Sequence, residues 1–230
     1  MPKRKPAAAP ASDEVTRIRL LEAAGPIFAS EGFHKAKIRS ICARAGANVA
    51  AVNYHFGDKL GLYTDVLRYS ISAAVIDPHL IANAAGVPVE AKLRAFVRMI
   101  LNSVFQATRP AWYMKLVLQE MSNPTPAIDE LVREFIRPRY RLLCELIGGI
   151  IGQSAKARVT QLCAHSVVGQ ARHYLIANAV IEKVWPEFTF TAEELEELTD
   201  HIIVFSLGGI RAAGAAKSRV KTSYGKRRHY

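Results

Sequence analysis

Apolar residues recur three and four positions apart along most of the chain, a spacing that places them on one face of an α-helix. Proline, glycine and capping residues separate these periodic segments. No segment alternates between apolar and polar residues as a half-buried strand would. The pattern therefore predicts an all-α protein of about nine helices, at residues 12–30, 38–45, 49–55, 58–75, 88–107, 110–121, 126–151, 155–183 and 191–213.

Individual residues predict where these helices begin, bend or end. Gly32 follows the first helix and should end it. Pro26 and Pro138 lie within predicted helices, where a missing N–H bends the backbone. Thr191 precedes two glutamates and should cap the last helix.

The clearest local pattern covers residues 38–56 and predicts two helices joined by a tight turn. Ile38, Ile41, Cys42 and Ala45 share one face of the first helix. Gly46 follows, where a helix end favours a residue that tolerates positive φ. Asn48 then stands at the N-cap position of the second helix, where asparagine is one of the preferred residues.

The second helix of this pair has two different faces. Val52 and Phe56 should point into the core. The opposite face should be exposed and carries Val49, Ala50, Ala51, Asn53, Tyr54 and His55. An apolar-backed helix that presents small residues, an amide and ring donors suits the major groove of DNA.

From residue 14 to residue 74 the chain resembles the DNA-binding domain of the TetR family of bacterial repressors. The resemblance rests on the order and spacing of Ile18, Ala23, Ala24, Phe28, Gly32, Phe33, Ile38, Ile41, Ala45, Gly46, Tyr54, His55, Phe56, Lys59, Leu62 and Tyr63. It implies a three-helix DNA-binding domain with a helix-turn-helix motif at residues 37–56. It also implies a dimer that binds a palindromic operator.

The resemblance assigns roles to particular residues of the motif. Tyr54, His55 and Lys59 match positions that usually contact phosphate. His55 has an alternative interpretation, in which it caps or packs within the turn. Lys37 stands where most members have a capping threonine or serine, so we expect a weaker cap but an added phosphate-reaching cation. Arg39 should lie beside the same phosphate backbone.

The residues that would read bases lie on the second helix. Most family members have tyrosine at the position of Asn53, and an amide can bind adenine through two hydrogen bonds. Asn53 is therefore the leading base reader, with a phosphate or water contact as the alternative. Ala50 and Ala51 would press on thymine methyl groups or simply allow close approach. The predicted DNA-binding set is Lys37, Arg39, Asn48, Val49, Ala50, Ala51, Asn53, Tyr54, His55 and Lys59.

The formal net charge of +11 is concentrated at the two ends of the chain. Residues 1–12 and 214–230 hold nine of the 31 basic residues and no acid, which leaves 22 basic residues against 20 acids between them. We expect both segments to be disordered basic tails. Either the tails are simply solvated or they contact DNA phosphates beside the specific site.

The larger half of the chain, residues 75–213, should bind a ligand and form a homodimer. The helices predicted at 155–183 and 192–213 are apolar and rich in small residues, which favours a four-helix interface between two subunits. The alternative is that these faces pack within one subunit. A second resemblance, to the TetR subgroup with a CecR (YbiH)-type C-terminal domain, rests on residues 109–110, 116–129, 137–138, 169–170 and 185–186.

That subgroup includes regulators of drug susceptibility and efflux, so we expect a small apolar or drug-like effector that releases a repressor from DNA. An apolar pocket favours aromatic and methionine side chains with a few polar groups. The candidates are Phe96, Ile100, Phe105, Trp112, Met114, Leu118, Met121, Phe135, His173 and Tyr174. Each of them suits an ordinary helical core as well.

Other functional classes have less support from the sequence. Glu197 and His201 lie one turn apart but lack a matching pair, and there is no phosphate loop or nucleophile motif, so we expect no enzyme, metal or cofactor. Cys42, Cys144 and Cys163 should be buried thiols in a reducing cytoplasm. We expect a cytoplasmic, nucleoid-associated protein without a membrane span. A non-specific nucleic-acid-binding or scaffold protein that uses its basic tails is the remaining alternative.

Overall fold

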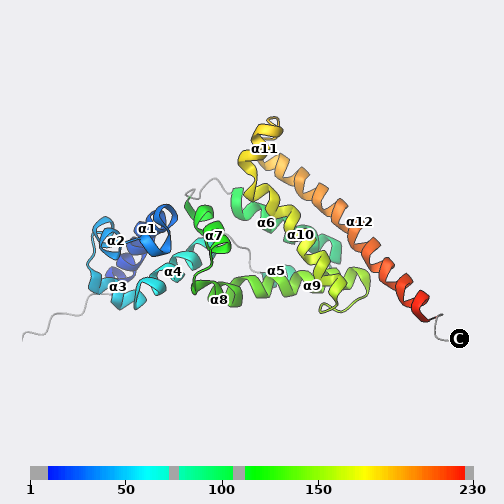
Figure 1. Ribbon diagram of the computed structural model, residues 1–230, viewed down its shortest axis with the longest axis horizontal. Helices are drawn as coiled ribbons and strands as arrows, with labels where there is room; N and C mark the ends of the chain where they lie inside the picture. Colours follow the sequence, from blue (N-terminus) through cyan, green and yellow to red (C-terminus); the bar gives the residue numbers. More distant parts are fainter. Residues whose placement is uncertain (1–9, 73–77, 106–111, 226–230) are drawn as a thin grey trace, which may run out of the picture. The chain divides into compact units, whose positions relative to one another are not determined.

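The computed structural model describes residues 10–72, 78–105 and 112–225, and every regular element in these ranges is helical (Figure 1). The all-α prediction is confirmed. The helices form two compact units: residues 1–73 with 108–134, and residues 74–107 with 135–230. Residues 112–134 therefore pack with the N-terminal helices, although the sequence placed them in the second domain.

The first unit contains the predicted helix-turn-helix. It comprises α1 (Pro10–Lys35), α2 (Ile38–Ala45), α3 (Val49–Phe56), α4 (Lys59–Ser72), α7 (Trp112–Ser122) and α8 (Ala127–Leu131). Helix α1 packs against α2, α4 and α7, and α4 also packs against α3 and α8. The largest fully buried side chains of this unit are Leu20, Leu21, Phe28, Ile41, Leu62, Leu67 and Leu116.

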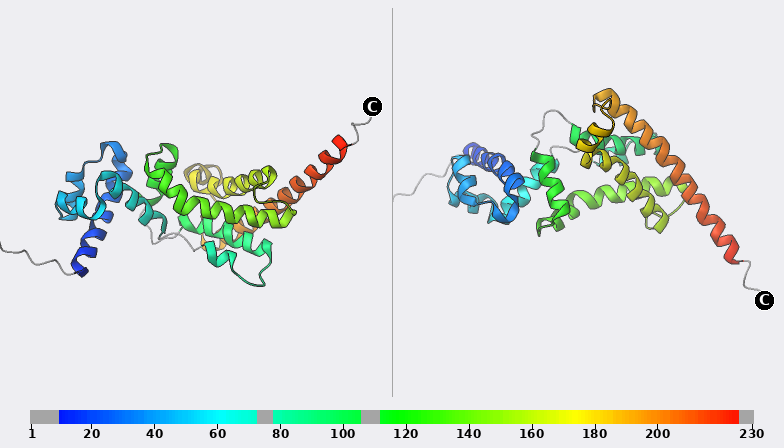
Figure 2. Two further views of the ribbon diagram at one scale, coloured as in Figure 1. Left: turned by 90° about the horizontal axis from the view of Figure 1, so that it is seen from below. Right: turned by 45° about the horizontal axis from the view of Figure 1, so that its top comes forward.

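The second unit is a helical bundle. It comprises α5 (Pro78–Ala82), α6 (Val89–Phe105), α9 (Arg137–Ile151), α10 (Arg158–Ile176), α11 (Asn178–Val184) and α12 (Ala192–Gly225). Helices α6, α9, α10 and α12 pack against one another, and α10 and α12 run side by side (Figures 1 and 2). Its fully buried large side chains are Leu93, Leu101, Leu143, Ile147 and Ile202.

Several predicted helix boundaries are confirmed by their local chemistry. Gly32 interrupts the first helix with φ 77° and ψ 164°, whereas Pro26 is accommodated within it. Gly46 ends α2 in the left-handed conformation with φ 60°. At the start of α12, Thr191 Oγ1 accepts a hydrogen bond from Glu194 N at 3.3 Å, and Glu194 Oε2 accepts one from Thr191 N at 3.2 Å. This is the predicted capping motif.

Four features of the described residues differ from the prediction. Pro78 opens a short helix, α5, where the sequence indicated only a break. The helix predicted at 155–183 is divided at Ala177, because Asn178 Oδ1 accepts a hydrogen bond from Ala179 N and competes for the backbone. Residues 132–136, ahead of Pro138, form a π-helical turn. Residues 10–12 and 214–225 belong to α1 and α12, so they are helical rather than parts of disordered tails. The remainder of the expected tails, residues 1–9 and 226–230, lies outside the described residues.

Candidate nucleic-acid interface

The turn between α2 and α3 is held by backbone geometry and by an arginine from α1. Ile41, Cys42 and Ala45 are buried, which fixes α2 against the core. Arg19 Nη2 donates hydrogen bonds to the carbonyl oxygens of Ala45 and Gly46, the latter at 2.9 Å. The carbonyl groups at the end of α2 therefore receive a charged donor in addition to the glycine cap.

Asn48 caps α3, as the sequence predicts. Its Oδ1 accepts a hydrogen bond from Ala51 N at 2.9 Å, and its backbone is extended with φ −110°. Four residues into the helix, Val52 is only 1% exposed and anchors α3 from behind. Asn48 Oδ1 is therefore engaged in capping α3. A role for Asn48 in contacting DNA stays a prediction.

The outer face of α3 is open to solvent for most of the predicted residues. Tyr54 is 74% exposed and Val49 is 42% exposed. Ala50 and Asn53 are exposed as well, and Ala51 is half-buried. The face therefore combines a phenol, an amide and small apolar groups, which are able to donate to phosphates, bind a base edge and contact methyl groups respectively.

His55 is not on this exposed face, and the prediction of an outward side chain is wrong. Its side chain is 7% exposed, and Nε2 lies 3.5 Å from Oδ1 of Asp13 in α1. The reason is helical periodicity, because position 55 follows the buried Val52 by three residues and so shares its inner side. The alternative interpretation, in which His55 packs within the motif, matches this geometry.

The predicted phosphate-binding cations differ in whether their side chains contact other groups of the protein. Lys37 and Arg39 are exposed at the start of α2, and the side chain of Lys37 makes no capping hydrogen bond, as expected. Lys59 Nζ instead donates to the carbonyl oxygen of His34 at 3.1 Å and lies 5.1 Å from the centroid of the Phe33 ring. Lys59 therefore links the start of α4 to the end of α1.

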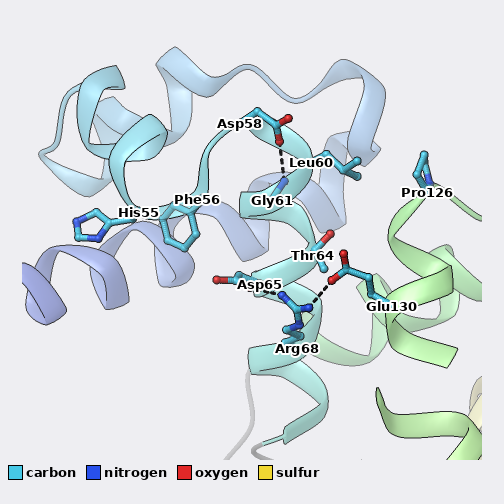
Figure 3. A pocket seen from close by; sticks show the side chains of 10 residues that line it. All are labelled: His55, Phe56, Asp58, Leu60, Gly61, Thr64, Asp65, Arg68, Pro126 and Glu130. Atoms are coloured by element: carbon cyan, nitrogen blue, oxygen red, sulfur yellow. Dashed lines mark hydrogen bonds and ion pairs between the residues drawn. The ribbon is translucent and has the colours of Figure 1, made fainter. Parts of the chain in front are cut away.

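Most of the ion pairs behind α3 join residues that are far apart in the chain, so the sequence did not predict them. Arg17 Nη2 donates to Asp65 Oδ2 at 2.9 Å, and its guanidinium lies 5.7 Å from the centroid of the Phe56 ring. Arg68 on α4 is bound by Asp65, Glu130 and Glu134. Asp65, Arg68 and Glu130 from this group line a pocket of about 270 Å³ at the end of α3 (Figure 3).

The residues predicted for an effector pocket are divided between the two units. Trp112, Met114, Leu118 and Met121 lie on α7 in the first unit. A Cβ added at Gly25 would lie 2.1 Å from Cη2 of Trp112, so this indole packs directly on the α1 backbone. This contact is the ordinary core packing that the sequence left as an alternative for Trp112.

The remaining residues of this set belong to the second unit. Phe96 is 2% exposed within the core of the bundle, and Ile100 and Tyr174 are partly buried against that core. His173 is exposed, Phe135 follows directly on the first unit in the chain, and the side chain of Phe105 lies outside the described residues. The pocket shown in Figure 3 includes none of the ten predicted residues among its lining.

Cys42, Cys144 and Cys163 are all free and buried, which confirms the prediction of packed thiols. Burial raises the pKa of each of these thiols, so they remain protonated and weakly nucleophilic. Among the described residues no helix is long and apolar enough to cross a membrane. The same part of the chain holds no group of three or more histidine, cysteine or carboxylate residues placed to bind a metal.

Comparison with known proteins gives matches over both parts of the chain. The model of the tetR family of bacterial regulatory proteins matches residues 20–66. The model of the C-terminal domain of the HTH-type transcriptional dual regulator CecR matches residues 89–210. The HTH-type transcriptional dual regulator CecR of Shigella flexneri is 26% identical over 204 residues, which cover 82% of this chain and 90% of that protein.

Solved structures share the fold at lower sequence identity. The transcriptional regulator FadR from Bacillus subtilis, in complex with stearoyl-CoA, has a TM-score of 0.61 at 11% identity, covering 84% of this chain and 98% of that one. The fatty acid degradation regulator FadR from Bacillus halodurans has a TM-score of 0.58 at 16% identity, with coverage of 84% and 98%. From the family matches, the chain belongs to the TetR family of bacterial regulatory proteins, with a CecR-type C-terminal domain, and is a transcriptional regulator rather than an enzyme.

Proposed function

We propose that the protein binds a palindromic operator as a homodimer, reads it with the outer face of α3, and is released by a small apolar or drug-like effector. The exposed face of α3 carries this proposal. Tyr54 is 74% exposed while Val52, two residues earlier, is 1% exposed. One face of α3 therefore packs on the core and the opposite face is open to solvent. The proposed contacts are Asn53 to a base edge, Tyr54, Lys37 and Arg39 to phosphates, and Val49, Ala50 and Ala51 to methyl groups.

Residues His55, Asn48 and Lys59 have a different part in the proposal. The side chains of all three are engaged with protein groups, namely Asp13, Ala51 N and the carbonyl oxygen of His34. We propose that they position α3 and the start of α4, and that their contacts with DNA are made by backbone N–H groups or through the remaining donor capacity of Lys59.

A homodimer through α10 and α12 is the second part of the proposal. Leu162 on α10 is 56% exposed, and Val204 and Phe205 on α12 are 74% and 65% exposed. The exposed glycines Gly169, Gly208 and Gly209 have no atom within 4 Å of an added Cβ. Large apolar groups interspersed with open glycines on two adjacent helices suit close packing against a second copy.

The DNA-binding claim is tested by titrating genomic fragments selected by the purified protein. A specific regulator should bind a selected palindrome more tightly than a scrambled duplex, and its affinity should fall steeply with salt because each neutralised phosphate releases counterions. A variant lacking residues 1–9 and 217–230 should keep most of this discrimination. Loss of all binding on removal of both ends, with no preference before removal, would instead favour the non-specific nucleic-acid-binding alternative.

The effector claim rests on differential affinity. We propose that an apolar compound binds the helical bundle, near Phe96, Ile100, His173 and Tyr174, and favours a conformation that does not bind DNA. Tyr174 lies in an aromatic cluster, with its ring centroid 6.0 Å from that of Phe188. Compounds identified by a shift in the unfolding temperature would be titrated calorimetrically with and without operator, and equal affinities in the two titrations would reject the claim.

A further inference from the structure

The turn that leads into α3 uses a side chain from another helix to satisfy part of its backbone. The last carbonyl groups of an α-helix have no partner within the helix itself. At the end of α2, the carbonyl oxygens of Cys42 and Ala43 accept hydrogen bonds from backbone N–H groups of the turn at 3.0 and 3.3 Å. The carbonyl oxygens of Ala45 and Gly46 accept theirs from Nη2 of Arg19, which lies on α1. One exposed arginine therefore completes the hydrogen bonding of the turn.

Gly46 makes room for this arginine. A Cβ added at Gly46 would lie 2.7 Å from Nη2 of Arg19, so a side chain at this position would displace the guanidinium. The backbone of Gly46 has φ 60°, which glycine adopts without strain. The guanidinium is also a cation at the C-terminal end of α2, where the helix dipole is negative and favours positive charge. Both space and charge therefore fit Arg19 to the end of α2.

The turn has little core packing of its own. Ala45 is 6% exposed and Val52 is 1% exposed, but the six residues between them are all exposed or half-buried. The cap from Asn48 Oδ1 to Ala51 N joins residues of this same stretch, so it orders the start of α3 without attaching it to another helix. The hydrogen bonds from Arg19 attach the stretch to α1.

The opposite end of α3 is held to α1 by other side chains. His55 Nε2 lies 3.5 Å from Oδ1 of Asp13, and the guanidinium of Arg17 lies 5.7 Å from the centroid of the Phe56 ring. These contacts remain when the hydrogen bonds from Arg19 are lost. Loss of Arg19 would therefore release the start of α3 while its end stays in place, and the helix would tilt about that end.

We propose that Arg19 is a positioning residue for DNA reading, which holds the start of α3 in place and does not itself contact DNA. Groups that bind a partner must be held within about 0.5 Å and 10–20° of the productive geometry, and a tilt would move residues 49–51 away from the base edges. Lys37 and Arg39, the proposed phosphate contacts at the start of α2, lie outside the part that moves. This inference rests on the proposed function, because it needs α3 to read an operator.

Amide hydrogen exchange in the free, full-length protein tests whether Arg19 holds the helix. Arg19→Met keeps an apolar stem and removes the donors, so exchange in residues 46–52 should become faster by about fivefold, with α4 unchanged. Arg19→Lys keeps a charged donor and should recover most of the protection. Wild-type exchange at 46–52 in Arg19→Met would overturn the inference. Equal acceleration in α4 would also overturn it, because Arg19 would then stabilise the whole unit rather than position α3.

Fluorescence anisotropy tests the role in reading, with the duplex that the wild-type protein selects from a random pool and a scrambled duplex, each at several salt concentrations. Arg19→Met should lower operator affinity by about tenfold and leave scrambled affinity and the salt dependence unchanged, because no phosphate contact is lost. Arg39→Met is the matched comparison, at another exposed arginine of the first unit. It should weaken both duplexes alike and reduce the slope of log affinity against log salt by about one.

The two measurements separate failure of the inference from failure of the proposed function. A reduced salt slope in Arg19→Met, an equal loss on both duplexes, or wild-type operator affinity would overturn the inference alone. A wild-type protein that prefers no duplex would refute the proposed function, and with it the role of Arg19 in reading DNA. The exchange measurement would still show in that case whether Arg19 holds the start of α3.

Discussion

Helix α3 shows how neighbouring residues acquire different environments. Val52 is 1% exposed and Asn53 is exposed, because successive side chains on a helix point about 100° apart. The sequence predicts both positions from this periodicity. The same periodicity places His55 inward, three residues after Val52, whereas the family resemblance predicts a phosphate contact at this position. Helical phase is the better guide at this position.

Substitution of Asn53 should impair discrimination between DNA sequences rather than general affinity for DNA. Asn53→Ala should cost about 1–3 kcal/mol of discrimination at one base pair of each half-site and little elsewhere, because a bidentate amide-to-adenine contact is lost. Titration of operators substituted at each position would measure this. Arg44→Ala, another exposed change in the motif, should leave discrimination intact. A uniform loss on all duplexes would mean that Asn53 contacts phosphate instead.

A buried pair in the first unit predicts sensitivity to high pH. Tyr63 Oη donates to Glu120 Oε2 at 2.8 Å, and the two residues are 2% and 1% exposed. Burial first, and then the hydrogen bond and charge of Glu120, raise the pKa of Tyr63 above its ordinary value. The folded state therefore keeps this proton while the unfolded state loses it above about pH 10, and the free energy of unfolding falls as the pH rises.

Tyr63→Phe should remove this component of the pH dependence. The variant should be less stable at pH 7, because Glu120 keeps only its bonds from Thr125 N and Oγ1. Its free energy of unfolding should then change less between pH 9 and about pH 11 than that of the wild type. Urea unfolding at each pH measures both values. Parallel curves for the two proteins would show that Tyr63 does not titrate differently in the folded state.

At the scale of elements, the cap of α3 can be tested on its own. Asn48→Ala removes the acceptor for Ala51 N and should lower the free energy of unfolding by about 1 kcal/mol. Asn48→Ser keeps an acceptor and should restore most of it. Operator affinity should follow the same order, because the cap fixes the start of the reading helix. Equal stability of the alanine and serine variants would show that the cap contributes nothing.

Helix boundaries were predictable where a single residue sets them and less so where tertiary contacts do. Gly32, Gly46, Asn48 and Thr191 each act through local backbone chemistry, and each marks a boundary in the structure. The form of the irregularity before Pro138 was not predictable, because a proline within a helical segment permits either a kink or a π-turn. Long-range partners such as Arg19 for Gly46 leave no periodic signal in the sequence.

At the scale of the whole molecule, the exposed apolar residues of α10 and α12 predict the oligomeric state. Phe205→Glu combined with Val204→Glu places charges on side chains that are 65% and 74% exposed and should yield a folded monomer. Light scattering measures the mass, and operator affinity should fall with it because one recognition helix then binds alone. Leu80→Glu, at a residue 68% exposed on α5, should stay dimeric. A doubly substituted protein that keeps the wild-type mass would place the interface elsewhere.

The division of the chain into two units was only partly visible in the sequence. Residues 38–56 identify the DNA-binding part through periodicity and caps. The return of α7 and α8 to that part depends on contacts such as Trp112 on Gly25 and Glu130 on Arg68, which join distant residues. The sequence could not single out residues for an effector pocket, because aromatic and methionine residues fill cores and line cavities with the same pattern.

The most direct measurement is selection of duplexes from a random DNA pool by the wild-type protein and by a variant with Asn53→Ala and Tyr54→Ala. Both residues are exposed, so the variant should fold with an unchanged unfolding midpoint. We expect the wild type to enrich one motif with two-fold symmetry and the variant to enrich none. Enrichment of the same motif by both proteins would contradict the claim that the outer face of α3 reads the operator.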